Sequence, residues 1–90
     1  MNQSTISEMR HAIGLDYKSP KRGKYTAYRN YAMYTAPHSD WEELIKNGHA
    51  ECRYVEKSGW LPEKSYWYSL SRAGLDMMET MIGAKIDVVA

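Results

Sequence analysis

Residues 65–75 read Ser65-Tyr66-Trp67-Tyr68-Ser69-Leu70-Ser71-Arg72-Ala73-Gly74-Leu75. The first six residues alternate, with Tyr66, Tyr68 and Leu70 on one face, which predicts a β-strand. Ser71 is a preferred residue type at a helix N-cap, and Gly83 is a preferred type at a helix end. The apolar face of the expected helix comprises Leu75, Met78 and Ile82, with Met81 beside them. The segment therefore predicts a strand that runs directly into a helix.

The preceding segment predicts a partner for this strand. Residues 50–56 also alternate, with Ala50, Cys52 and Tyr54 on one face and Glu51 and Arg53 on the other. Residues 57–64 between the two segments include a Gly and a Pro, which are typical of a turn. We therefore expect an antiparallel hairpin with its tip at 57–64, and we expect Cys52 to be a small buried apolar residue.

Residues 30–48 predict a short strand and a second helix. Residues 30–35 are rich in β-forming residues and are followed by Pro37. Ser39 and Glu42 form a capping signature at the start of a helix that carries Trp41 on its apolar face. Asn47-Gly48 then marks the end of that helix.

The N-terminal third predicts one more helix and a long loop. Thr5 and Glu8 form a second capping box, so we expect a helix from Thr5 to Gly14. Residues 15–29 are predicted to be a loop, and the apolar tail 83–90 is left unplaced. The expected fold is a single α+β, winged-helix-like domain spanning 1–90, in the order helix, strand, helix, β-hairpin, helix.

The run 41–82 carries the winged-helix resemblance. It contains a helix ending in Leu44-Ile45-x-x-Gly48, a strand, a wing-like tip, a second strand, and Tyr68-x-Leu70-Ser71-x-x-Gly74. This order resembles winged-helix regulators, which implies a domain that reads DNA. Two features depart from that family. Residues 25–38 read as extended where those proteins have a helix, and the helix in the recognition position begins with Asp40, Glu42 and Glu43, which phosphates would repel.

The whole chain also resembles a group of small phage and prophage proteins, on the segments 9–15, 28–31, 41–48 and 66–74. This resemblance implies no particular activity. It implies an accessory protein acting in the host cell cytoplasm.

The composition limits the classes of protein to which the chain can belong. Ninety residues, 43% of them hydrophobic, suit one small globular domain rather than a disordered chain. A lone cysteine excludes an intramolecular disulfide framework, and the first residues show no apolar signal region. No stretch has the length of apolar sequence that a membrane span needs. We therefore expect a cytoplasmic protein with no membrane partner.

A basic, tyrosine-rich segment, residues 17–34, is the leading candidate site. No acidic residue occurs between Asp16 and Asp40, although the formal net charge of the chain is only +1. Cationic side chains neutralise phosphates and tyrosines can stack on unpaired bases. The candidate residues for binding DNA or RNA are Lys18, Lys21, Arg22, Lys24 and Arg29, with Tyr25 and Tyr28 as stacking partners. The alternative is a solvated basic loop whose tyrosines return to the core.

A second interpretation is a protein-interaction or homodimerisation module that binds a host or phage protein. Its candidate residues are Trp60 and Leu61 at the hairpin tip and Met77 and Met81 on the last helix.

Enzymatic and metal-binding classes have little support. His49 and Cys52 are three apart in a predicted strand, and such residues face opposite sides. No nucleophile elbow, phosphate loop or metalloprotease pattern occurs. We predict no catalytic residue, no metal and no cofactor.

Overall fold

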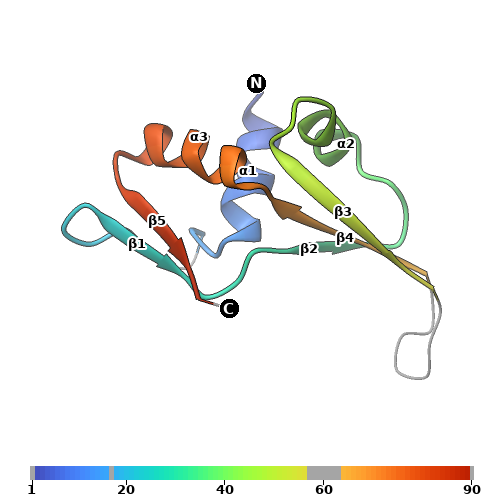
Figure 1. Cartoon of the computed structure of the whole chain (residues 1–90), viewed down its shortest axis with the longest axis horizontal. Helices are drawn as coiled ribbons and strands as arrows, with labels where there is room; N and C mark the ends of the chain where they lie inside the picture. Colours follow the sequence, from blue (N-terminus) through green and yellow to red (C-terminus); the bar gives the residue numbers. More distant parts are fainter. Residues whose placement is uncertain (1, 17, 57–63, 90) are drawn as a thin grey trace.

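The computed structural model describes residues 2–16, 18–56 and 64–89. Its elements are α1 (Gln3–Ala12), β1 (Lys24–Ala27), β2 (Ala32–Tyr34), α2 (Ser39–Lys46), β3 (Ala50–Val55), β4 (Ser65–Leu70), α3 (Arg72–Ile82) and β5 (Lys85–Val88). They form two sheets, an antiparallel sheet in the order β2-β4-β3 and a parallel pair of β1 and β5 (Figure 1). The α+β class is confirmed.

The predicted antiparallel pairing of the strands at 50–56 and 65–70 is confirmed, and residues 57–63 of the predicted tip lie outside the described residues. Tyr68 in the central strand β4 pairs with Ala32 on one side and with Cys52 on the other. The Asn30 side chain extends the ladder beyond β2, because its amide donates to the Leu70 carbonyl oxygen and accepts from the Leu70 N–H, both at 2.9 Å. The sheet therefore holds the end of β4, where α3 begins, in a fixed position.

Cys52 is exposed, so the prediction that it is buried was wrong. Its strand, β3, is an outer strand of the sheet, and within β3 only Ala50 is buried. An edge strand that the helices cover at one end exposes side chains on both of its faces.

The start of α1 was predicted three residues too late. Asn2 is the N-cap, and its Oδ1 accepts hydrogen bonds from the N–H and the hydroxyl of Thr5, both at 2.8 Å. Thr5 is buried inside the helix. In α2 the cap is His38 rather than Ser39, and no side-chain cap bond forms there. The predicted cap of α3 is confirmed, since Ser71 Oγ accepts from the Gly74 N–H.

The predicted loop 15–29 contains a strand, so that prediction was wrong for β1. β1 pairs in parallel with β5, which places the tail that the sequence left unassigned. Tyr25 and Ile86 are register partners, and both side chains are buried. The pairing joins residues 24–27 to residues 85–88, which are far apart in the sequence, so no local pattern shows it.

Aromatic packing joins the helices to the three-stranded sheet. The rings of Trp41 and Tyr68 stack with centroids 5.6 Å apart, and neither residue is exposed to solvent. Glu8 Oε1 accepts hydrogen bonds from Trp41 Nε1 at 3.0 Å and from the Tyr34 hydroxyl. One carboxylate on α1 therefore connects α2 and β2.

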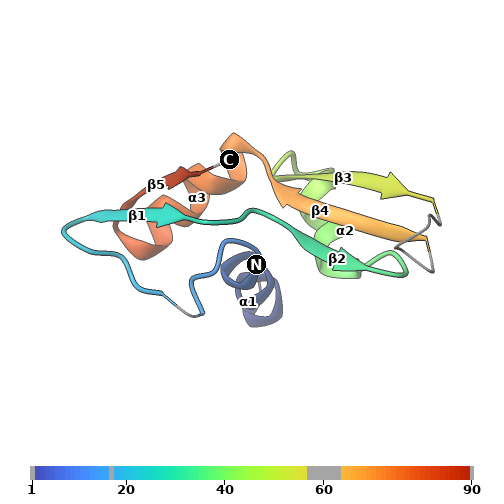
Figure 2. The same ribbon diagram turned by 90° about the horizontal axis from the view of Figure 1, so that it is seen from below.

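The helices α2 and α3 lie on one side of the two sheets (Figure 1). Viewed from below, β2, β4 and β1 lie in front of these helices, so one face of each sheet is directed away from them (Figure 2). We call the face that is directed away from α2 and α3 the uncovered face of each sheet.

Candidate nucleic-acid interface

A tight turn displays the central part of the basic segment. The Lys21 N–H donates to the Lys24 carbonyl oxygen at 2.8 Å, and the Lys24 N–H donates back to the Lys21 oxygen at 3.0 Å. The two residues between them, Arg22 and Gly23, both have positive φ, as in a type I′ turn. All four residues are exposed. The turn therefore places three cations, Lys21, Arg22 and Lys24, at the N-terminal end of β1.

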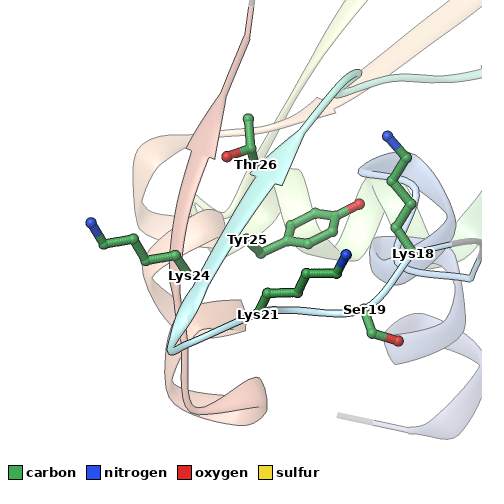
Figure 3. Close-up of a pocket in the computed structure, with 6 residues that line it drawn as sticks. All are labelled: Lys18, Ser19, Lys21, Lys24, Tyr25 and Thr26. Atoms are coloured by element: carbon green, nitrogen blue, oxygen red, sulfur yellow. The ribbon is translucent and has the colours of Figure 1, made fainter.

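A shallow hollow lies beside this turn, lined by Lys18, Ser19, Lys21, Lys24, Tyr25 and Thr26 (Figure 3). In Figure 3 the side chains of Lys18 and Lys21 lie on the same side of β1 as the Tyr25 ring, and Lys24 extends to the opposite side. No acidic residue is among those lining the hollow.

The exposed cations extend beyond the predicted set. Lys85 on β5 is the register partner of Lys24, and both are exposed. Within the described part of the chain, neither these two lysines nor Lys21 and Arg22 form an ion pair with a carboxylate. Sequence reasoning missed Lys85 because its proximity depends on the β1–β5 pairing.

Tyr25 is only 3% exposed, and its hydroxyl donates to the Ile13 carbonyl oxygen at 2.6 Å. Burial, followed by the effect of Tyr28, raises the pKa of the Tyr25 hydroxyl. The prediction that Tyr25 stacks on a base is contradicted, because its ring is part of the core.

Tyr28 is exposed, but cations of the same segment already contact its ring. Lys18 Nζ lies 4.9 Å and Arg29 Cζ 5.4 Å from the ring centroid, both within cation–π range. The ring also packs over Gly14, where an added Cβ would come within 2.4 Å of it. Tyr28 therefore positions the Lys18 ammonium group beside the hollow.

Arg29 has structural partners. Its Nη2 donates to the His11 carbonyl oxygen at 2.6 Å and lies 4.0 Å from Asp16 Oδ1. The other Asp16 oxygen lies 2.7 Å from His11 Nδ1, and this hydrogen bond is the main cause of the lowered pKa of Asp16. Arg29 thus connects the segment after β1 to the end of α1. Lys18, Lys21 and Lys24, in contrast, are exposed to solvent.

A second feature, which sequence reasoning did not select, lies on the uncovered face of the three-stranded sheet. Met33, Trp67 and Arg53 are register partners across β2, β4 and β3, so their side chains share one face. The Tyr31 ring lies 5.3 Å from the Trp67 ring, at an angle of 45°. Tyr31 and Met33 are 46% and 45% exposed. The sequence signal was available, because Trp67 lies on the face opposite Tyr66 and Tyr68.

Only two of the four residues of the second interpretation are among the described residues. Trp60 and Leu61 lie outside the described residues. Met77 is half-buried and packs against the core, so it has the ordinary role of a helix methionine. Met81 is 43% exposed.

The described part of the chain contains no group of three or more His, Cys, Asp and Glu side chains placed to hold a metal ion. Burial, followed by the nearby Glu42 carboxylate, raises the pKa of the Cys52 thiol, which keeps it in the less nucleophilic neutral form. Among the described helices, none combines the length and apolar character required to cross a bilayer.

Comparison with protein-family models gave no match, and neither did comparison with curated proteins or with solved structures. The function is therefore inferred from the residues of this chain.

Proposed function

We propose that this domain is a non-enzymatic nucleic-acid-binding module that contacts phosphates through a cationic turn, defined as Lys21, Arg22 and Lys24 with the flanking Lys18 and Lys85. One observation carries the proposal. Three of these cations, Lys18, Lys21 and Lys24, surround a hollow, and none of the described residues that line it is acidic.

The charge placement is suited to phosphates, because several cations that lie close together can neutralise several phosphates of one nucleic-acid strand. Lys21, Arg22 and Lys24 lie on one four-residue turn, and Lys85 lies beside Lys24 on the next strand. Each phosphate that a cation neutralises releases condensed counterions, so binding through such a set depends strongly on salt concentration.

The helix α2 is a poor candidate for reading DNA. Asp40 and Glu42 are in its first turn, and Trp41 and Leu44 face the core. We also propose that the helices and strands have a winged-helix-like arrangement. It is supported by the central position of β4 between β2 and β3. On this proposal the domain binds through its strands and the cationic turn.

The test compares two double variants that remove the same charge. Lys21→Ala/Lys24→Ala removes two cations of the turn, and Lys46→Ala/Lys64→Ala removes two exposed cations elsewhere. Binding of a labelled oligonucleotide is measured by fluorescence anisotropy at low salt. We expect the turn variant to bind at least about tenfold more weakly than wild type, and the control to change little. Equal weakening in both variants would mean that net charge, and not this turn, governs binding.

A further inference from the structure

The uncovered face of the three-stranded sheet has an aromatic character that the fold does not require. Side chains on the opposite face of the same strands, such as Tyr68 and Leu70, already supply the core. Tyr31 and Met33 are nevertheless nearly half exposed. An outward sheet face that only meets water ordinarily carries polar residues.

The arrangement on this face is suited to a flat ligand. Tyr31 and Trp67 form a ring pair at the centre, and Arg53 flanks Trp67 in register on the outer strand. Trp67 is half-buried, and its Nε1 is itself buried without a hydrogen-bond partner among the described residues, so it is the ring and not this nitrogen that the face presents. Aromatic rings and an arginine guanidinium are the groups on which nucleobases stack.

Two members of the cationic set, Lys24 and Lys85, lie on the outward face of the β1–β5 pair, whereas Lys18 and Lys21 lie on the Tyr25 side of β1 (Figure 3). Lys24 and Lys85 alternate with the buried Tyr25 and Ile86, so they point away from the core, and the outward faces of both sheets are seen together in Figure 2. Four residues connect β1 to β2, and the seven residue steps from Lys24 to Tyr31 span at most ~25 Å. That is within the reach of a few nucleotides of one strand.

We infer that the ligand is single-stranded nucleic acid, with its phosphates on the cationic turn and its unpaired bases stacked on Tyr31 and Trp67. The inference rests on the proposed function and names its substrate class. Charge favours a polyanion on this side, because Lys24, Lys85 and Arg53 outnumber the outward carboxylates of the paired strands, Glu51 and Asp87. A duplex encloses its bases in a stack, so it would meet the lysines but could not use the rings.

Three probes of equal length distinguish phosphate binding by the cationic turn from base stacking on the rings. They are a DNA single strand, the corresponding duplex, and an abasic strand that retains the sugar and phosphates without bases. We expect the single strand to bind at least about tenfold more tightly than the abasic strand, since stacking on a single aromatic side chain can account for that ratio. Equal binding of all three probes would overturn the inference and leave the cationic turn intact as a phosphate site. Absence of salt-dependent binding to any probe would overturn both.

The matched variants are Tyr31→Ala and Tyr31→Phe, at an exposed position whose backbone N–H bond to the Ala12 oxygen both variants keep. We expect the alanine variant to lose most of the preference for the single strand while binding the abasic strand as before. The phenylalanine variant should keep the preference. An alanine variant that keeps the full preference would contradict the role of the ring pair.

Discussion

The Tyr68 hydroxyl donates a hydrogen bond of 2.6 Å to Glu42 Oε2 and accepts one of 3.1 Å from the His38 N–H. These two hydrogen bonds therefore connect the central strand β4 to the start of α2. The three-stranded sheet owes its position under the helices in part to this contact, so the aromatic face on its other side depends on it too.

Alkaline pH should weaken the fold through this contact. Burial and the hydrogen bond to Glu42 raise the pKa of Tyr68 to about 12, from about 10 in an unfolded chain. A raised pKa contributes stability that is complete below pH ~10 and is lost as the pH rises towards ~12. We expect the free energy of unfolding, measured by denaturant titration, to fall over that range. Tyr68→Phe should be less stable at neutral pH and show a shallower fall, and an equally steep fall would assign the effect to other groups.

The carboxylate of Glu8 should be a large single contributor to stability. It accepts from both Trp41 Nε1 and the Tyr34 hydroxyl. Glu8→Leu leaves both donors without this acceptor, which should cost about 2–4 kcal/mol. Glu8→Gln keeps one oxygen acceptor and should cost clearly less. Similar losses in the two variants, measured by urea unfolding, would show that the hydrogen bonds are not the cause.

Gly74 should tolerate no side chain. A Cβ at this position would lie 2.0 Å from the His49 carbonyl oxygen, which belongs to the backbone just before β3. Gly74→Ala should therefore destabilise the fold by about 3 kcal/mol or more, at the upper end for overpacking. Its control is Ala73→Gly at the neighbouring exposed position, which should cost no more than ~1 kcal/mol. A thermal melt of Gly74→Ala that matched wild type would disprove the close approach of α3 to this backbone.

The outer edge of β5 is covered by an Arg–Glu pair from α3. Glu79 Oε2 accepts from the Ile86 N–H at 2.7 Å and from Arg72 Nη2 at 3.1 Å. Unpaired strand edges promote pairing between chains. We therefore expect Glu79→Ala to self-associate at concentrations where wild type does not, as measured by light scattering, and Glu79→Gln to associate less. Unchanged masses for all three proteins would show that the pair has no protective role.

Local signals predicted the C-terminal half of the fold well. The alternation in 65–70 and the cap at Ser71 depend on neighbouring residues, and both are confirmed. The β1–β5 pair was not predicted, because its partners lie far apart in the sequence and each strand has only four residues. A short strand with charged and polar outward residues, such as Lys24 and Thr26, has little hydrophobic pattern to distinguish it from a loop.

The candidate site could be predicted only in part, for the same reason. The exposed lysines of the turn were identified from charge alone. Tyr25 was misassigned because its inward direction depends on the pairing with β5, and Arg29 finds its partners at the end of α1. The alternation in 65–70 placed Trp67 on the face opposite Tyr66 and Tyr68, but no local pattern shows whether a further element covers that face, so Trp67 was not selected.

The salt dependence of single-strand binding tests the cationic turn most directly. A plot of log K against log salt concentration has a slope of about −0.7 per neutralised phosphate for a single strand. For wild type we predict a slope of about −2 to −3, reduced in magnitude by about 1 to 1.5 in Lys21→Ala/Lys24→Ala and unchanged in Lys46→Ala/Lys64→Ala. The same slope in all three proteins would contradict the account, because phosphates would then be neutralised elsewhere on the molecule.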